Sequence, residues 1–507
     1  PAMQSEVWLL CATLAAALLY YLTSAARRGG TGRRPPPGPT PLPVVGNLLD
    51  LGGNLHHTLA RLARAHGPVM KLKLGMVTTV VVSSHDAARE AFTRYDRHLA
   101  ARAVPDAANA VGNSGRSMIW LPSSDPLWKT LRGIVASHVF SPRGLAVARG
   151  VRERKVRDMV GYFRRCVGEE VDVGQAVYGG VLNLVSSAFF SVDVVDVGGE
   201  SASELREVVE DIIAALGKPN VSDIFPSLRP LDLQGWRRWA GARYQKVFGI
   251  LDGIIDRRLA DARTSCTGEH AHGDFLDSLL ELVSAGKIGR DKVTVILFDV
   301  FAAGTDTMAI TVEWAMAELL RHPRAMAKAR AEMEDVLGGK VDTDTLEEPD
   351  AASLPYLQAV VKEVMRLHPV APIMLPHQAA EDGVEIGGFA VPRGATVIFN
   401  VWAIMRDPAA WERPDEFVPE RFLDKAADRA VEFRGKDYEF LPFGSGRRLC
   451  PGLPMAERVV PFVLASLLHA FEWRLPDGVA ADELDVTEKF TTVNTLAVPL
   501  RAVPVMV

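Results

Sequence analysis

The 507-residue chain is 48% hydrophobic and has a net charge of −5, which is enough apolar content for a large core and gives no reason to expect nucleic acid as a partner. Its four cysteines, Cys11, Cys166, Cys266 and Cys450, form no Cys-x-x-Cys pair. This spacing excludes a disulfide framework and a cysteine-ligated zinc cluster.

Residues 1–28 are predicted to form an N-terminal membrane anchor. Twenty residues from Val7 to Ala26 carry no charge and would span roughly 30 Å as a helix, which matches the hydrocarbon core of a bilayer. Arginines follow this run and only Glu6 precedes it, so the positive-inside rule places the rest of the chain in the cytosol. A cleaved secretory signal is the alternative, but it requires cations before the apolar run.

Residues 29–45 are basic and rich in proline, and they are predicted to form a stiff hinge in the polyproline II conformation. Residues 46–507 contain no internal repeat or long polar linker and are predicted to form one domain. Residues 69–75 and 77–83 have the pattern of a β-hairpin, and residues 384–401 form a second β-rich stretch. The remainder carries helical periodicity, so we expect a mainly α fold with a small β-sheet region.

Trp128 and Arg132 are four residues apart, on one face of a predicted helix. On spacing alone, an ordinary amphipathic helix explains them better than a binding site. From Lys129 to Arg165 there are ten basic residues against two acidic ones. Such a patch either steers an acidic partner or is a solvated helix face.

The apolar run from Asp291 to Leu320 predicts a helix of about 45 Å, ended by His322 and Pro323. The sequence Ala-Gly-Thr-Asp-Thr at 303–307 interrupts this run. Glycine inside a helix costs about 1 kcal/mol relative to alanine, and a carboxylate among apolar neighbours costs more unless it is paired. Because these residues violate the local preferences of a helix, they indicate a functional site. The alternative is a kinked core helix in which the acid forms a salt bridge.

Glu363 and Arg366 place opposite charges three residues apart on a predicted helix, which alone indicates only a surface pair. Arg421 follows in the sequence Pro-Glu-Arg-Phe, and His377 follows Leu-Pro.

Residues 440–452 read Phe-Leu-Pro-Phe-Gly-Ser-Gly-Arg-Arg-Leu-Cys-Pro-Gly. The glycines permit tight turns, and Pro451 suits the first turn of a following helix. Cys450 would then lie at a helix N-terminus with Arg447 and Arg448 beside it, where the dipole and the cations favour the thiolate. An iron ligand needs this charge state, whereas the alternative is a glycine-rich turn around a buried structural cysteine.

The spacing Phe443-x-x-Gly446-x-Arg448-x-Cys450-x-Gly452 resembles the haem-binding signature of the cytochrome P450 family. The resemblance covers essentially the whole chain and implies the cytochrome P450 fold behind an N-terminal transmembrane helix. It also implies haem b, with its iron bound by the sulfur of Cys450.

The resemblance also implies roles for residues outside this loop. Thr307 and Asp306 would manage the protons of oxygen activation, while Glu363, Arg366 and Arg421 would form a structural network. The cofactor would be held by six further residues: Trp128, Arg132, His377, Phe443, Gly444 and Arg448.

The implied activity is NADPH- and O2-dependent monooxygenation. The chain has no Gly-x-Gly-x-x-Gly stretch or flavin module, so NADPH would act through a separate reductase at the endoplasmic reticulum membrane, docked near the basic patch. A peroxide-rearranging haem-thiolate enzyme and a non-catalytic haem protein are remote alternatives.

Segments that line the substrate pocket in such enzymes are largely apolar here, which favours a lipophilic substrate. They are 118–121, 298, 301–302, 370–375 and 492–493, and the alternative is that these residues simply belong to the core. The loop sequence is most similar to plant A-type microsomal enzymes, in the style of the geraniol hydroxylases and the grass hydroxylases of labdane-related, cassadiene-type diterpenes. A terpenoid of plant defence is therefore expected, with flavonoid, phenylpropanoid or fatty-acid hydroxylation as the alternative.

Overall fold

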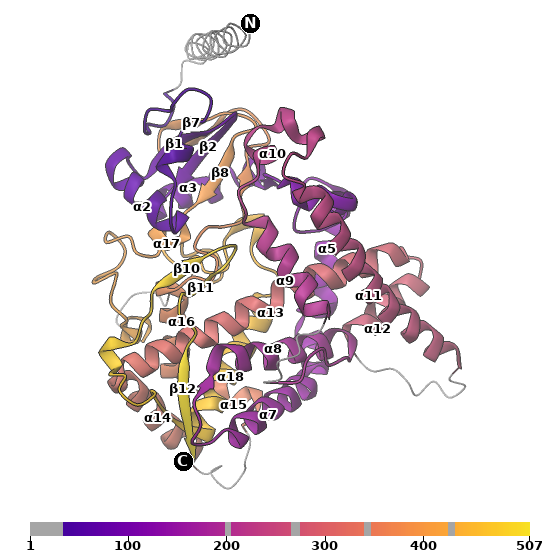
Figure 1. The fold of residues 1–507 in the computed structure, drawn as a ribbon, viewed down its shortest axis with the longest axis vertical. Coiled ribbons are helices and arrows are strands. Elements are labelled where there is room, and N and C mark those ends of the chain that lie inside the picture. The colour runs from indigo at the N-terminus through magenta and orange to yellow at the C-terminus, as the bar shows by residue number, and fades with distance from the viewer. Residues whose placement is uncertain (1–33, 198–203, 265–273, 339–345, 424–430, 507) are drawn as a thin grey trace, which may run out of the picture.

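The computed structural model describes residues 34–197, 204–264, 274–338, 346–423 and 431–506. The predicted anchor, residues 1–28, and the start of the hinge lie outside these ranges. Helices dominate the described part, and its strands form four small sheets (Figure 1). The predicted mainly α class with a small β-sheet region is confirmed.

The largest sheet contains the predicted hairpin. β1 (Val69–Leu74) pairs antiparallel with β2 (Val77–Val82), and β8 (Thr396–Phe399), from the second predicted β-rich stretch, lies parallel to β2. The two-residue strands β5 (His377–Gln378) and β3 (Ala101–Arg102) complete the sheet. Their antiparallel pairing sets Arg102 opposite His377, which becomes important at the functional site.

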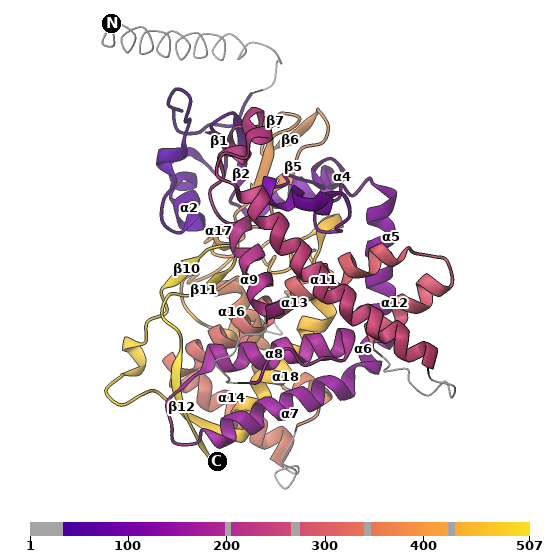
Figure 2. The ribbon, with the colours of Figure 1, turned by 45° about the vertical axis from the view of Figure 1, so that its right-hand side comes forward.

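Strand β2 is buried on both faces because successive side chains of a strand point in opposite directions. Val80 and Val82 pack with the hydrophobic cluster that includes α3 (His85–Arg94), whereas Val81 packs with α2 (Leu55–His66). The sheet and α2 lie together at one end of the domain (Figures 1 and 2). Helices α7 (Arg149–Arg165), α8 (Val173–Phe190) and α18 (Leu453–Ala470) lie at the other end. The remaining sheets are β4 (Val171–Asp172) with β12 (Arg501–Met506) and β9 (Phe471–Arg474); β6 (Val384–Ile386) with β7 (Phe389–Val391); and β10 (Glu488–Phe490) with β11 (Asn494–Leu496).

Helix α13 (Arg290–Arg321) is the predicted long apolar helix, and it runs without interruption through residues 303–307. It packs against α8 (Val173–Phe190), α11 (Trp236–Thr264), α16 (Pro355–Leu367) and α18 (Leu453–Ala470). Among the described residues, α8, α13 and α18 are apolar and long enough to cross a membrane, yet most of each is buried inside the domain. These three helices therefore form the core.

Shorter elements connect these parts. The other α-helices are α4 (Asp96–Leu99), α5 (Pro126–Ile134), α6 (Pro142–Val147), α7 (Arg149–Arg165), α9 (Glu204–Leu216), α10 (Val221–Ile224), α12 (Phe275–Ser284), α14 (Pro323–Leu337), α15 (Glu348–Ala352) and α17 (Val401–Ile404). The 3-10 helices are η2 (Leu48–Asp50), η3 (Asp106–Gly115), η5 (Pro226–Leu231), η7 (Pro419–Phe422), η8 (Gly446–Arg448) and η9 (Ala481–Glu483), and η4 (Val135–Val139) is a π-helix.

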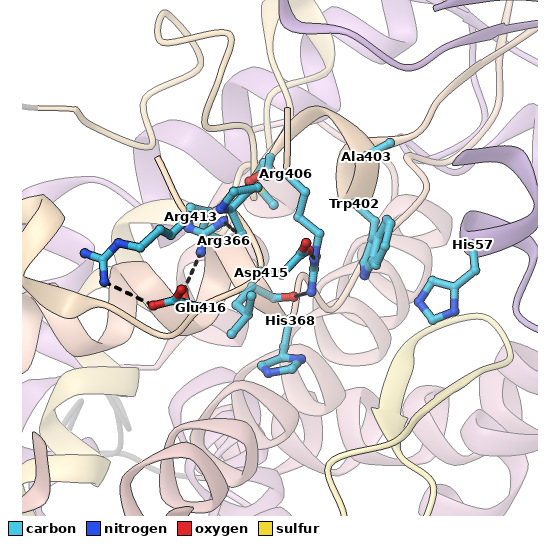
Figure 3. A network of polar contacts seen from close by, with 12 residues as sticks. His57, Arg366, His368, Trp402, Ala403, Arg406, Arg413, Asp415 and Glu416 are labelled. Atoms are coloured by element: carbon cyan, nitrogen blue, oxygen red, sulfur yellow. Dashed lines mark hydrogen bonds and ion pairs between the residues drawn. The ribbon is translucent and has the colours of Figure 1, made fainter. Parts of the chain in front are cut away.

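Glu363 and Arg366 on α16 form a fully buried ion pair with two contacts, of 2.7 and 2.9 Å. Arg421 on η7 adds a third contact, from its Nε to Glu363 Oε1 at 3.1 Å. The Arg366 guanidinium also donates to three backbone carbonyls, those of Met405, Pro414 and Glu416 (Figure 3). This network ties α16 to the long irregular segment that precedes the cysteine loop.

We expect Arg366→Ala to lower the free energy of unfolding by about 3–5 kcal/mol, because it leaves the buried Glu363 carboxylate without its main partner. Arg413→Ala is the matched control. Arg413 and Glu416 are also three residues apart and 3.1 Å from each other, but their side chains are 54% and 59% exposed (Figure 3). That change should alter stability by less than about 0.5 kcal/mol. Urea unfolding followed by circular dichroism measures both, and equal losses would contradict the prediction.

Candidate active site

Cys450 lies between η8 and the first turn of α18, in a loop shaped by glycine. Its amide donates to the carbonyl of Phe443 at 3.0 Å, and the Phe443 ring packs against the main core. Gly444 and Gly446 have φ values of +74° and +63°. A Cβ on Gly446 would lie 2.1 Å from Asp96 Oδ1, so this position requires glycine. The loop therefore holds the cysteine in a fixed place at the helix start, as predicted.

Burial raises the pKa of the Cys450 thiol above its ordinary value, although two backbone N–H groups at the start of α18 and the charge of Arg132 act in the opposite direction. The prediction that Arg447 and Arg448 favour the thiolate is wrong. Arg447 pairs with Asp96 at 3.3 Å, and Arg448 points to backbone carbonyls elsewhere. The protein alone therefore leaves this thiol protonated more readily than a free cysteine, and a bound cation is what would stabilise its thiolate.

Three guanidinium groups, those of Arg102, Arg132 and Arg448, gather near the cysteine. In the hydrogen bonds of the described residues, all three donate to backbone carbonyls: Arg102 to Leu375, Arg132 to Leu449, and Arg448 to Ala100, Met118 and Leu121. Arg102 Nε is buried and has no hydrogen-bond partner among the described residues. We call these three residues the arginine cluster.

Within the described residues, the positive charge of the arginine cluster is compensated only in part, by Asp96, which acts on Arg448. Burial and the repulsion of Arg448 and Arg132 lower the pKa of Arg102 to about 9, and burial together with Arg132 lowers the pKa of Arg448 to about 10. His377 lies next to them, its Nδ1 2.8 Å from the Leu99 carbonyl. Burial and the charges of Arg102 and Arg448 hold the pKa of His377 well below its ordinary value, so its ring is neutral. This environment favours an anion.

Trp128 on α5 borders the same cluster. Its Nε1 donates to the Met118 carbonyl at 3.1 Å, and the Arg448 guanidinium lies 5.1 Å from its ring centre. Arg132 lies one turn further along α5, as the four-residue spacing predicted. The structure therefore brings together Trp128, Arg132, His377 and Arg448, which the sequence analysis had singled out separately.

Helix α13 presents Thr307 on an exposed face in the middle of an otherwise buried helix. Thr307 and Ala303 are exposed, whereas Thr305 and Met308 are buried and Asp306 is half-buried. The Thr307 hydroxyl donates to the Ala303 carbonyl at 3.1 Å, which leaves its oxygen lone pairs available to accept.

Residues 36–497 match the cytochrome P450 family. The chain is a member of that family. It is 69% identical over 471 residues to cytochrome P450 76M5 of rice (Oryza sativa subsp. japonica), covering 93% of this chain and 92% of that protein. Ent-cassadiene C11-alpha-hydroxylase 1 and oryzalexin D synthase, also from rice, are 62% and 63% identical over 504 residues, with 99% of both chains covered in each comparison. The protein is thus a cytochrome P450 monooxygenase, and its family is defined by haem with an axial cysteine.

The residues of this site fit haem. The cofactor carries two carboxylates, which match a buried arginine cluster that includes an unpartnered Nε. The sulfur of Cys450 suits iron. Arg102 was missed by the sequence analysis. It belongs to no motif, and only the pairing of β3 with β5 brings it opposite His377.

Asp299 is a second residue that sequence reasoning missed. It is buried on α13, two turns before Thr307, and accepts from the Ser117 hydroxyl at 2.8 Å and the Met118 amide at 2.9 Å. The Met118 carbonyl in turn accepts from both Trp128 and Arg448. Asp299 therefore positions the segment that supports the arginine cluster. The sequence contained a signal for Asp299, because it is a carboxylate within the same apolar run, and that observation was the argument for Asp306.

Two predicted pocket residues lie in the core instead. Phe298 packs edge-on against Tyr244 and Phe248 of α11, at ring distances of 5.5 and 5.7 Å. Phe301 packs against Phe190 of α8 at 5.7 Å and is 1% exposed. Their neighbours on α8 and α11 already bury them, so they are structural residues of this P450.

Other predicted pocket segments do meet. The Asn494 amide donates to the Val370 carbonyl at 2.9 Å, and the Thr492 hydroxyl donates to the Ile213 carbonyl of α9 at 2.7 Å. The turn at 491–493 is thereby held between α9 and the segment that starts at Val370. Thr492, Val493 and Val370 are only half-buried, so their side chains remain partly accessible.

Asp299 makes a testable contribution to the pH dependence of the free energy of unfolding. Burial raises its pKa from the ordinary 3.8 to about 7. The folded protein then retains a proton that the unfolded chain releases between these values, so this carboxyl destabilises the fold progressively as the pH rises through that window. Asparagine resembles the protonated acid and does not titrate. We expect the stability of Asp299→Asn relative to wild type to rise with pH, by up to about 1.4 kcal/mol per pH unit, and to level off near pH 7.

The measurement is the free energy of unfolding of both proteins at several pH values between 4 and 8. Asp291→Asn is the control, because Asp291 is an exposed carboxylate on the same helix whose pKa is lowered by Lys292. Its relative stability should not rise over this range. A pH-independent effect of Asp299→Asn would mean that Asp299 is ionised in the fold throughout.

Proposed function

We propose that this P450 hydroxylates a labdane-related diterpene, with Cys450 as the axial ligand of its haem. One atom of dioxygen enters a C–H bond of the substrate and the other is reduced to water. The observation that carries the proposal is the 62% identity, over 99% of both chains, to a rice ent-cassadiene C11-alpha-hydroxylase. A match of this length includes the segments around the site, and the matching protein is named for hydroxylating ent-cassadiene.

The chemistry of the site supports a large apolar substrate. The exposed face of α13 carries small side chains at Ala303 and Thr307, and Val370 and Val493, on other predicted pocket segments, are partly accessible. These groups recognise shape and not charge. A rigid polycyclic hydrocarbon suits such walls.

When bound, the haem supplies the redox chemistry that activates dioxygen. The arginine cluster, Trp128 and His377 would hold its carboxylates, and Phe443 and Gly444 would lie against the ring. Thr307 would hold a proton at its hydroxyl beside the reacting oxygen, and Asp306, the preceding residue, would resupply it from solvent. Proton delivery by this pair is the step that separates productive turnover from loss of peroxide.

Membrane attachment at the endoplasmic reticulum is part of the proposal. Residues 1–28 would anchor the chain, 29–45 would form the hinge, and 46–507 would be the cytosolic domain. Large apolar side chains are exposed on the sheet end and on the α10–η5 segment: Leu42, Val44, Leu49, Met76, Leu231 and Leu233. The two surfaces adjoin, because the Met76 amide donates to the Ile224 carbonyl at 3.0 Å. Such a patch suits a lipid surface.

Electrons would come from NADPH through a separate reductase. The predicted basic surface is smaller than its sequence suggests, because Arg152 is buried against Glu348 and Arg132 belongs to the arginine cluster. The exposed cations Lys129, Arg143, Arg154, Arg157, Arg164 and Arg165 remain, on and around α5 and α7. An acidic reductase surface would be steered to this face.

The first test is product analysis by mass spectrometry after co-expression with a plant reductase. The substrates are ent-cassadiene and other labdane-related diterpene olefins, with monoterpenols, flavonoids and fatty acids for comparison. NADPH-dependent gain of one oxygen by a diterpene is the expected result. Oxidation of only a flavonoid or fatty acid would overturn the substrate assignment and leave the monooxygenase activity intact.

Thr307→Ala should uncouple the enzyme, so that NADPH is consumed but peroxide accumulates in place of product, by about tenfold or more relative to wild type. Thr305→Val is the matched control, because Thr305 is buried two residues away and donates only within the helix in the described contacts, to the Phe301 carbonyl at 3.2 Å. The ratio of product to NADPH should stay near the wild-type value in that variant. Tight coupling in Thr307→Ala would exclude the proposed proton route.

A further inference from the structure

A cluster outside the active site brings two imidazoles to one carboxylate oxygen. His56 and His57, at the start of α2, place their Nε2 atoms 2.9 and 2.7 Å from Oε2 of Glu488, the first residue of β10. The three donor atoms all lie within 4.8 Å of one another. His57 lies at the edge of this network, beside Trp402 (Figure 3).

The other oxygen of Glu488 has different partners. Oε1 faces His368 Nδ1 at 3.3 Å, Trp402 Nε1 at 3.3 Å and the Arg406 guanidinium at 3.9 Å. His368 is in turn 2.7 Å from Glu318 on α13. These contacts fix the plane of the Glu488 carboxylate, so that Oε2 alone is directed at the two histidines.

The backbone of the cluster is also fixed. Asn54, the residue before α2, donates to the Glu488 carbonyl at 2.7 Å and accepts from the Phe490 amide at 2.9 Å. The Asn54 side chain therefore ties the start of α2 to the backbone of β10, which reduces the entropy lost when a ligand joins the two elements.

We propose that His56, His57 and Glu488 bind one divalent transition-metal ion of the Zn2+ class. Two imidazole nitrogens and one carboxylate oxygen are a recognised zinc donor set, which leaves a fourth position for water. His56 is fully buried, whereas the His57 side chain is 43% exposed and gives the ion a path from solvent.

Metal binding requires a small adjustment. Ligands at about 2.1 Å from a tetrahedral ion are separated by roughly 3.4 Å, so the two histidine nitrogens must move away from Glu488 Oε2 by about 0.5–0.7 Å. The exposed ring of His57 has the freedom to do so. The ion would replace two hydrogen bonds by bonds that link α2 to the β10–β11 hairpin, while the positive charge of Arg406 on the far oxygen weakens the affinity.

The test uses the full-length, haem-loaded protein with its affinity tag removed, after treatment with a chelator. Zinc is titrated by calorimetry, and bound metal is counted against haem. We expect one zinc per haem, at least tenfold weaker binding in His57→Ala, and a rise in thermal stability with zinc that this variant lacks. Unchanged haem absorbance verifies that the variant is folded.

His85→Ala is the matched control. His85 is also paired with a half-buried carboxylate, that of Asp407, at 3.0 Å. In the described contacts, no second histidine lies at that carboxylate oxygen. Its zinc affinity should equal that of wild type. The proposal is overturned if wild type binds no zinc at millimolar concentration, or if His57→Ala binds it equally well. Either outcome would leave the cluster as a hydrogen-bond network only, without affecting the proposed hydroxylase activity.

Discussion

Repulsion among the buried guanidinium groups of Arg102, Arg132 and Arg448 is the constraint on which the active site depends. Like charges in a low-dielectric interior are stable only if fixed dipoles and an anion compensate them. Here each group is held by backbone carbonyls from distant parts of the chain, including those of Ala100, Met118 and Leu449. The sheet, the segment before α5 and the cysteine loop therefore together hold positive charge near the Cys450 thiol, where an anion would be stabilised.

The sequence predicted the parts of this site whose geometry is local. The cysteine loop, the Trp128–Arg132 pair and the length of α13 follow from turn chemistry and helical spacing, and the structure has each of these elements. Arg102 could not be found in this way, because a two-residue strand has no periodicity. The opposite error was made with Arg447 and Arg448, whose closeness to Cys450 in sequence was taken to mean that their charges act on its thiolate. Within η8 their side chains diverge, one to Asp96 and the other to backbone carbonyls.

Apolar composition likewise could not separate the pocket wall from the core. Phe298 and Phe301 were expected to face the substrate, but aromatic neighbours on α11 and α8 bury both of them. The exposed face of α13 is instead made by Ala303 and Thr307, four residues apart and therefore above one another on the helix. These small side chains leave the helix backbone open to close approach, and they belong to the least hydrophobic part of the apolar run.

One helix sets the positions of both sides of the site. Through Asp299, α13 holds the Ser117–Met118 segment, and the Met118 carbonyl supports Trp128 and Arg448. About two turns beyond Thr307, Trp314 Nε1 donates to the Asn494 carbonyl at 3.1 Å and so holds the hairpin whose turn meets α9. Loosening either segment breaks a buried hydrogen bond, at a cost of about 1–3 kcal/mol. Helix α13 therefore positions both the turn at 491–493 and the segment that supports the arginine cluster. A shift in the loop at Met118 must displace Trp128 and Arg448, which donate to its carbonyl.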